Sequence, residues 1–416
     1  MHVTGIVAEY NPFHNGHLYQ LNESRKLIPS DFVIAVMSGN FTQRGLPSIT
    51  DKFVRTQMAL SCGVDMVLEL PVVFATASAE RFSEAAISIL QKTGLVSSLS
   101  FGSEIGDVTL LKDIATVLTD EPPFLSSLIK EYLSQGYSFP RAREAALIHF
   151  FSQPTNNPRL HDLSLIQKAV GSPNNILGIE YLKALIKYQS FITPLTIKRR
   201  LSNYHDTEIY SAIASATAIR TQFKTSDSSE VIKKCMPPAS YELLRKHTQC
   251  MPDINDLEAF LHYKFIFSNK HDLYALWDIP DDLIRSLLKC FTKNTSMSQL
   301  IEESTSKTYT KATVQRAIFK IILNVLQEDM KRLEPINWIP YIRVLGCKKN
   351  ASFLLSELTK KASVPVITQL KPSYPQISEE AEILLNYELN ASNLYHYIQK
   401  NTSPYNQDFT QPFIKY

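Results

Sequence analysis

The chain has 416 residues, of which 44% are hydrophobic and 20% charged, and its formal net charge is +3 at pH 7. This composition is typical of a soluble globular protein, and the length predicts two or three domains. No uninterrupted apolar run is as long as a membrane span, and the first residues form a strand-like run rather than a basic and then apolar leader, so we expect a cytoplasmic protein.

The five cysteines are scattered and form no CxxC pair, which predicts neither a disulfide framework nor a zinc site. The small net charge does not by itself indicate a nucleic-acid-binding protein, so local clusters of Lys and Arg matter more. Those clusters are Lys198-Arg199-Arg200, Lys233-Lys234, Arg245-Lys246-His247, Lys348-Lys349 and Lys360-Lys361. Short clusters of this kind are more often solvated helix surfaces than RNA contacts.

The first predicted elements are a strand, Val3 to Ala8, and a helix from His17 onward. Asn11-Pro12 ends the strand, which leaves His14-Asn15-Gly16-His17 at the junction with the helix. Free backbone N–H groups and the positive end of a helix dipole meet at such a junction and favour a bound phosphate. Both imidazoles would point the same way in a first helical turn. The pattern predicts a phosphate site without a lysine; a purely structural histidine pair is the alternative.

An HxGH motif directly after the first strand resembles the signature of the HIGH-type nucleotidyltransferases and the class I aminoacyl-tRNA synthetases. The longer string AEYNPFHNGH, Ala8 to His17, resembles the bacterial tRNA(Met) cytidine acetate ligases. This resemblance implies that His14 and His17 stabilise the transition state at the α-phosphate of ATP. It also implies an ATP-binding stretch made of Val7, Ala8, Glu9, Tyr10, Asn11, Pro12, Phe13, His14, Asn15, Gly16, His17, Leu18, Tyr19 and Gln20.

The next predicted elements are strand, helix, strand and helix, at Phe32 to Gly39, Asp51 to Cys62, Asp65 to Pro71 and from Ser78 onward. In a doubly wound sheet, the loop after the second strand lies at the carboxyl edge beside the first loop, where ligands bind. Asn40, Gln43 and Arg44 are therefore candidate contacts to phosphate or substrate. A surface loop without a ligand is an equally good interpretation.

A fourth strand is predicted at Ser98 to Glu104, which completes the rhythm of a Rossmann-like, doubly wound parallel α/β sheet. Gly102 would lie at its carboxyl end, where the missing Cβ lets a base or ribose approach the backbone. A simple turn glycine is the alternative, whereas the family resemblance implies a contact to ATP. Residues from Ile105 to about 170 are mainly helical by period and indicate an insertion before the sheet resumes.

Ser172-Pro173-Asn174 predicts a helix start, with Asn174 as the N-terminal cap. The following strand, Pro194 to Arg200, would deliver Arg199 to the same carboxyl edge, where a guanidinium can bond two phosphate oxygens. We therefore expect Asn174 and Arg199 in one cleft. The family resemblance implies that Asn174 binds the nucleotide.

Ser211 to Arg220 resembles the ISSTxIR turn that ends the catalytic core of HIGH-type nucleotidyltransferases, with Ala216 at the second serine position. Hydroxyl groups, the N–H groups of a helix start and one arginine would form a clamp for the β- and γ-phosphates of ATP. Ser215, Thr217 and Arg220 are the expected members of this clamp and would neutralise the leaving pyrophosphate. A helix start made of small residues is the alternative.

After residue 225 the alternation of strands and helices ends, and helical segments separated by prolines follow. This change predicts a catalytic domain at 1–225 and a mostly helical domain at 226–416. Its expected elements are an amphipathic helix, a short strand and a loose tail, at Tyr309 to Leu326, Ile339 to Gly346 and Asn401 to Tyr416. A catalytic cleft alone is too small for an anticodon stem, so we expect this domain to contribute to tRNA binding. Arg343, Lys348 and Lys349 are the candidate contacts.

The residues alone imply that a nucleophile displaces pyrophosphate from ATP by positioning and electrostatics, with Mg²⁺ on the phosphates and no protein metal site. The family resemblance implies that acetate is the nucleophile. The acetyl group of the acetyl-adenylate would then pass to N4 of the wobble cytidine in elongator tRNA(Met), with release of AMP. Two alternatives remain: an adenylyltransferase for a small phosphorylated cofactor precursor, and an RNA-binding module that binds ATP without turnover. The sequence implies no stable protein partner.

Overall fold

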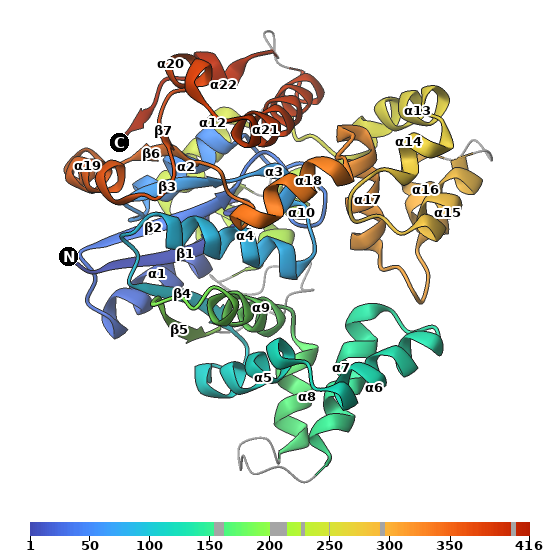
Figure 1. The fold of residues 1–416 in the computed structure, drawn as a ribbon. Helices are drawn as coiled ribbons and strands as arrows, with labels where there is room; N and C mark the ends of the chain where they lie inside the picture. Colours follow the sequence, from blue (N-terminus) through green and yellow to red (C-terminus); the bar gives the residue numbers. More distant parts are fainter. Residues whose placement is uncertain (154–161, 200–213, 226–228, 249, 292–295, 401–404) are drawn as a thin grey trace.

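The structure, a computed structural model, describes residues 1–153, 162–199, 214–225, 229–248, 250–291, 296–400 and 405–416. Its centre is a sheet in the order β5-β4-β1-β2-β3-β6-β7, with β8 paired to β6 (Figure 1). The strands are β1 Val3–Ala8, β2 Phe32–Ser38, β3 Met66–Leu70, β4 Ser98–Ser103, β5 Thr193–Lys198, β6 Ile342–Cys347, β7 Val366–Ile367 and β8 Ile414–Lys415. Strands β1 to β5 are parallel, which confirms the Rossmann-like, doubly wound sheet.

Helices cover both faces of the parallel strands, and the alternation of side chains along β2 shows how. Ile34 and Val36 belong to one buried cluster, whereas Val33 and Met37 belong to the other. The covering helices in this part of the chain are α1 Asn15–Leu27, α2 Lys52–Ser61, α3 Val72–Ala75, α4 Ala79–Lys92 and α9 Pro173–Lys187. The loops at the carboxyl ends of the strands are thereby held between two packed layers.

Two helical lobes extend from this core (Figure 1). The first lies between β4 and β5, where the sequence predicts an insertion, and contains α5 Val108–Asp120, α6 Pro123–Ser134, α7 Phe139–Phe151 and α8 Leu163–Gly171. The second contains α13 Glu258–Phe267, α14 Lys270–Tyr274, α15 Asp281–Phe291, α16 Met297–Ser304 and α17 Lys311–Leu323. Between the lobes in sequence, α10 Ala216–Thr225, α11 Ser229–Cys235 and α12 Pro238–His247 pack on the core.

The chain after α17 returns to the central sheet through β6, which overlaps the strand expected at Ile339 to Gly346. Strand β6 pairs antiparallel with β3, and Met66 lies opposite Cys347. The remaining helices are α18 Gln327–Leu333, α19 Ser352–Lys361, α20 Leu370–Ser373, α21 Glu379–Ile398 and α22 Gln407–Thr410. The expectation of a loose C-terminal tail is wrong for its described part, because Ile414 of β8 pairs with Gly346 of β6. These pairings join residues far apart in sequence, which local periodicity does not reveal.

A buried cluster of charged side chains fastens the C-terminal segment to the sheet. The Lys52 ammonium lies 2.6 Å from Glu69, 3.0 Å from Glu388 and 2.6 Å from Asp408, and its side chain is fully buried. Arg343 bonds Glu69 at 3.0 Å and Asp408 at 2.5 Å. Removal of one member would leave an uncompensated buried charge. Arg343 is therefore a structural residue, and its expected role as an RNA contact is wrong.

Candidate active site

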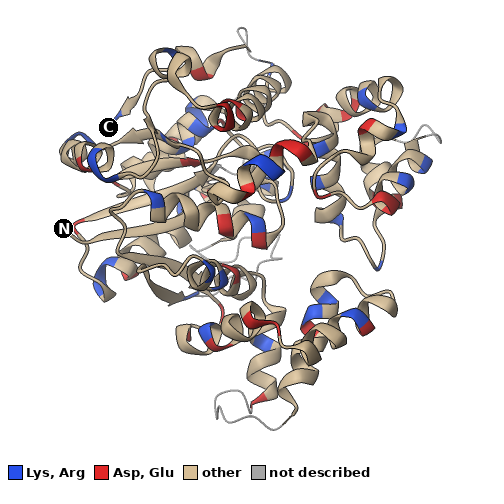
Figure 2. Ribbon diagram, in the orientation of Figure 1, with Lys and Arg blue, Asp and Glu red and all other residues tan. Residues whose placement is uncertain are grey.

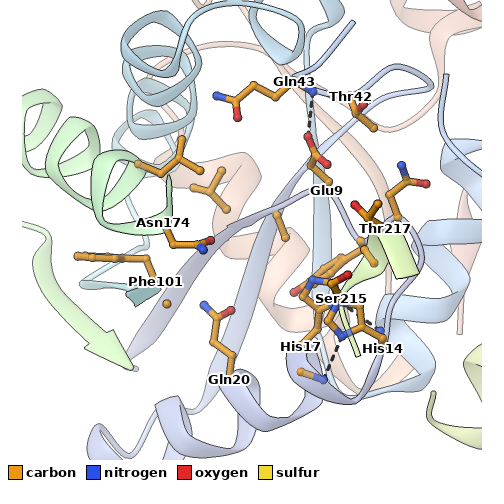
Figure 3. Close-up of a pocket in the computed structure, with 18 of the residues that line it drawn as sticks. Glu9, His14, His17, Gln20, Thr42, Gln43, Phe101, Asn174, Ser215 and Thr217 are labelled. Carbon is orange, nitrogen blue, oxygen red and sulfur yellow. Dashed lines mark hydrogen bonds between the residues drawn. The ribbon is translucent and has the colours of Figure 1, made fainter. Parts of the chain in front are cut away.

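A pocket opens at the carboxyl ends of β1, β2, β4 and β5, where the sequence places the candidate residues (Figure 3). The expected residues that line it are Val7, Ala8, Glu9, Tyr10, Asn11, His14, Gly16, His17, Tyr19, Gln20, Gly102, Asn174, Arg199, Ser215, Thr217 and Arg220. Four residues of the expected ATP-binding stretch do not line it: Pro12, Phe13, Asn15 and Leu18. Phe13 is fully buried, and the Asn15 amide donates to the Lys234 carbonyl at 2.9 Å, so both support the loop from behind.

His14 and His17 form the first turn of α1 through reciprocal capping. The Nδ1 of His14 accepts a hydrogen bond from the Gly16 N–H at 3.0 Å, and the Nδ1 of His17 accepts one from the His14 N–H at 3.2 Å. Because both Nδ1 atoms are acceptors, a neutral ring carries its proton on Nε2. The rings stack with centroids 3.8 Å apart. Each histidine thus keeps one N–H for a ligand in the pocket.

The surroundings keep both imidazoles neutral. Burial, together with the positive charges of Arg199 and Arg220, lowers the pKa of His14 to about 3. Burial and the neighbouring His14 also lower the pKa of His17 well below its ordinary value. An anion bound between these groups would raise both pKa values, since it favours the protonated ring.

The start of α10 provides the second group of donors. Ser215 Oγ accepts the N–H of Ala218 at 3.0 Å and caps the helix. Arg220 donates to Thr217 Oγ1 at 3.0 Å and to the Asn11 carbonyl at 2.8 Å, which ties this helix to the loop after β1. Both hydroxyl groups lie on the pocket lining. The structure thus brings the expected clamp residues next to the histidines (Figure 3), although Ser211 of the motif lies outside the described residues.

Asn174 lies on the opposite side of the pocket and is not the cap of α9. The helix starts one residue earlier, at Pro173, and the Glu104 carboxylate accepts the N–H groups of Asn174 and Asn175 at 3.3 and 2.9 Å. The Asn174 amide also donates to Glu104 at 2.6 Å, and its oxygen accepts from Arg199 at 3.4 Å. The Glu104 carboxylate, directly after β4, therefore performs the capping, and the expected pair of Asn174 and Arg199 does share one cleft. Arg200 lies outside the described residues.

Gly102 has space around it that the protein itself does not fill. A Cβ at this position would meet no atom closer than the Arg199 Cγ at 3.5 Å, which is an ordinary contact. The packing of the chain therefore does not require glycine here, and the open space faces the pocket. By contrast, a Cβ on Gly178 would come within 2.5 Å of the Phe101 ring, so that glycine serves packing.

The sequence motifs did not predict the aromatic residues on the side of the pocket that carries Asn174. Phe101 and Tyr181 line the pocket with ring centroids 5.9 Å apart, and Phe82, Leu177 and Ile197 join them. A nucleotide base can stack on or pack against such a surface. The regular apolar pattern of β4 and α9 looked like ordinary core in the sequence, so only the fold distinguishes these positions.

The loop after β2 forms a third side of the pocket. Gln43 donates its N–H to Glu9 Oε1 at 2.8 Å, and Thr42, Arg44, Leu46 and Pro47 also line the pocket. Glu9 is the single carboxylate among the described lining residues. The third candidate of this loop, Asn40, is wrong as a ligand contact, because it is buried and its amide bonds Ser392 and the Lys52 N–H.

Two further expectations concern distant parts of the molecule. Cys347 pairs with the first residue of β3, so Lys348 and Lys349 follow at the amino edge of the sheet, opposite the pocket. Lys348 also lies 3.5 Å from Asp65. Within the described residues, no group of three or more His, Cys, Asp or Glu could hold a metal ion, and no helix is long and apolar enough to cross a membrane.

Known proteins resemble this chain over its full length. A family model described as HIGH Nucleotidyl Transferase matches residues 1–410. The tRNA(Met) cytidine acetate ligase of Thermoanaerobacter sp. (strain X514) is 38% identical over 416 residues, and that of Clostridium perfringens (strain SM101 / Type A) is 36% identical over 417, each with 100% of both chains covered.

Two solved structures of one protein are similar to this chain over its whole length. The crystal structure of apo Thermotoga maritima TmcAL superposes with a TM-score of 0.91 at 32% identity and covers 100% of both chains. The same protein bound with alpha-thio ATP has a TM-score of 0.89 at 32% identity and covers 100% of this chain and 99% of its own. The fold and the pocket are thus those of a HIGH-type nucleotidyl transferase. Within that class, the chain belongs to the family of the tRNA(Met) cytidine acetate ligases.

Proposed function

We propose that the protein is an ATP-dependent ligase that activates acetate and acetylates N4 of the wobble cytidine of elongator tRNA(Met), giving N4-acetylcytidine, AMP and pyrophosphate. The observation that supports this most strongly is the meeting of His14, His17 and the start of α10 in one pocket, in a chain that matches named ligases over its whole length. A tRNA substrate implies that the reaction takes place in the cytoplasm.

We place ATP in the pocket in the following orientation. The aromatic residues and the open backbone at Gly102 suit the adenosine, with Asn174 and Arg199 beside it. His14 and His17 line the same pocket, and their Nε2–H groups would donate to the α-phosphate. Ser215, Thr217 and Arg220 would hold the β- and γ-phosphates, because hydroxyl groups and a guanidinium donate charge-assisted hydrogen bonds to phosphate.

The first step is adenylation. A carboxylate oxygen of acetate attacks the α-phosphorus, the bond from the α-phosphorus to the bridging oxygen breaks, and pyrophosphate leaves. The neutral histidines donate hydrogen bonds to the extra charge on the α-phosphate oxygens, while Arg220 stabilises the leaving group. No protein nucleophile takes part.

The side of the pocket across β1 from the adenosine remains free for the acceptor. It contains Arg44, which suits the carboxylate of acetate, and Glu9, which suits the exocyclic amine of cytosine. In the second step N4 attacks the acetyl carbon, the bond from that carbon to the AMP oxygen breaks, and the proton of N4 passes to Glu9. Glu9 acts as the general base of this transfer.

Mg²⁺ fits this pocket only as a companion of ATP. Glu9 lies on the acceptor side, and the described residues at the phosphate side offer hydroxyl groups, imidazoles and guanidinium groups rather than carboxylates. Mg²⁺ commonly binds through substrate phosphates and water with few protein ligands. The ion would neutralise phosphate charge, and the donors of the chain would orient the phosphates.

The fate of AMP separates this function from a small-molecule adenylyltransferase. Purified protein is incubated with ATP labelled in the adenine ring, acetate and tRNA, and the products are separated by chromatography. The ligase releases free labelled AMP in an amount that depends on both acetate and tRNA. Label retained in a covalent adenylylated product that forms without acetate would favour the alternative, and AMP release without acetate would contradict the ligase.

A further inference from the structure

Helices α10 to α12 carry a net positive charge. Residues 216–248 contain six Lys or Arg against three Asp or Glu, an excess as large as the +3 of the entire chain. Both helical lobes instead show basic and acidic residues side by side (Figure 2). The segment 216–248 therefore carries an excess of positive charge rather than balanced pairs.

The fold displays these charges on a firmly packed support. Ile232 and Cys235 of α11, with Tyr241 and Leu244 of α12, are buried in the cluster that also contains Phe13. The four basic residues that end these helices point outward: Lys233, Lys234, Arg245 and Lys246 are all exposed. Lys233 has only a 3.8 Å ion pair with the exposed Glu230, which holds it weakly. We call these four residues the basic surface.

The basic surface is attached directly to the histidine loop. The Asn15 amide donates to the Lys234 carbonyl at 2.9 Å, and Ser240 Oγ donates to the Phe13 carbonyl at 2.7 Å. Asn15 lies between His14 and Gly16, which both line the pocket. The main chain of Lys234 thus bonds a residue whose two neighbours in the sequence line the pocket.

We propose that the basic surface binds the phosphate backbone of the tRNA next to the nucleotide whose base enters the pocket. This inference rests on the proposed function and replaces Arg343, Lys348 and Lys349, which are buried or lie at the opposite edge of the sheet. A single-stranded anticodon loop can splay one base into a pocket while its neighbouring phosphates remain outside. Those phosphates are the groups that Lys and Arg bind without reading sequence.

The test removes the positive charges of the basic surface two residues at a time. The double variant Lys233→Gln with Lys234→Gln is compared with Lys360→Gln with Lys361→Gln, two exposed lysines at the end of α19 on the far side of the sheet (Figure 1). Lost phosphate contacts weaken RNA binding and flatten its salt dependence. We expect the KM for tRNA to rise about tenfold in the first variant, with a smaller slope of log KM against log salt concentration. The α19 variant should match the wild type.

Acetate-dependent ATP–pyrophosphate exchange, measured without tRNA on the same preparations, should be equal in all proteins, since the pocket is unchanged. A wild-type KM and salt slope in the α11 variant and in Arg245→Gln with Lys246→Gln would overturn the inference, while acetylation by the wild type would leave the proposed function standing. If the wild type itself shows neither acetate-dependent exchange nor tRNA acetylation, the proposed function fails instead.

Discussion

The Nδ1 of His17 accepts the N–H of His14 at 3.2 Å, and the two rings stack 3.8 Å apart. Together with the bond from Gly16 to His14, this arrangement assigns the ring nitrogens of each histidine: Nδ1 builds the helix turn, and Nε2 carries the proton of the neutral ring. The same side chains therefore stabilise the helix turn and donate hydrogen bonds in the pocket. An alanine variant would lose both functions at once and could not distinguish them.

Substitution of His14 by asparagine separates these roles. Asparagine is a good N-terminal cap, so His14→Asn should keep the turn but lose the Nε2 donor, whereas His14→Ala loses both. We expect both variants to lose about 10²–10³ in the rate of ATP–pyrophosphate exchange. Chemical denaturation should show a loss of about 1 kcal/mol in the free energy of unfolding for His14→Ala alone. Wild-type exchange in His14→Asn would contradict the assigned donor role.

Binding of ATP should be coupled to proton uptake. The pKa of His14 is lowered to about 3 by burial and by two arginines, and bound phosphates raise it again. At a pH between the His14 pKa values of the free and the bound enzyme, binding therefore takes up a proton, and at a pH above both values it does not. Calorimetry with an ATP analogue in buffers of different ionisation enthalpy measures this uptake. His14→Asn is the matched control, since it retains the protonation of the nucleotide itself; equal uptake by both proteins would refute the coupling.

On the nucleoside side, Asn174→Ala and Arg199→Ala should each weaken binding of a non-hydrolysable ATP analogue. Lys348→Ala with Lys349→Ala should leave its Kd unchanged, because these lysines follow β6 at the amino edge of the sheet. Isothermal titration gives both values. Similar losses in the two sets would show that the nucleotide binds elsewhere.

Glu9→Gln should separate the half-reactions. Glutamine retains an oxygen for the Gln43 N–H but cannot take a proton from the cytidine amine. Single-turnover transfer of acetyl to tRNA should fall by about 10²-fold or more, and far more than acetate-dependent exchange. A parallel decrease of both rates would place Glu9 in adenylation instead.

The buried charge cluster gives a prediction for stability. Lys52→Met leaves Glu69, Glu388 and Asp408 without their central cation and should cost about 3–5 kcal/mol in the free energy of unfolding. The control is Lys26→Met, whose ammonium lies 2.7 Å from Glu23 but is 71% exposed, so the loss should be about 1 kcal/mol or less. Urea unfolding measures both. Similar small losses would mean that the cluster does not secure the C-terminal segment.

The accuracy of the sequence predictions depended on how far apart the interacting residues lie. The strands β1 to β4 and the His14 turn depend on neighbouring residues, and local patterns placed them within one or two residues of their observed ends. The cap of α9 was wrong because Glu104, seventy positions away, takes the place that Asn174 was expected to fill. The same reason explains Arg343, whose burial depends on carboxylates at positions 69 and 408.

Some residues of the pocket could not be predicted from the sequence for a different reason. Phe101 and Tyr181 have the same apolar character as the core residues around them, and only the direction of the side chain separates wall from core. Glu9 stood inside the expected ATP-binding stretch, but its contact with the loop that carries Gln43 became visible only in the structure.

The central claim is that one pocket joins ATP cleavage to acetylation of a wobble cytidine. Its most direct test is nucleoside mass spectrometry of elongator tRNA(Met) after incubation with the purified protein, ATP and acetate, with free AMP counted in the same reaction. A transcript with uridine at the wobble position is the control. We predict one N4-acetylcytidine for each AMP released, and none with the control transcript. AMP release without acetylated cytidine, or acetylation that does not require ATP, would contradict the account.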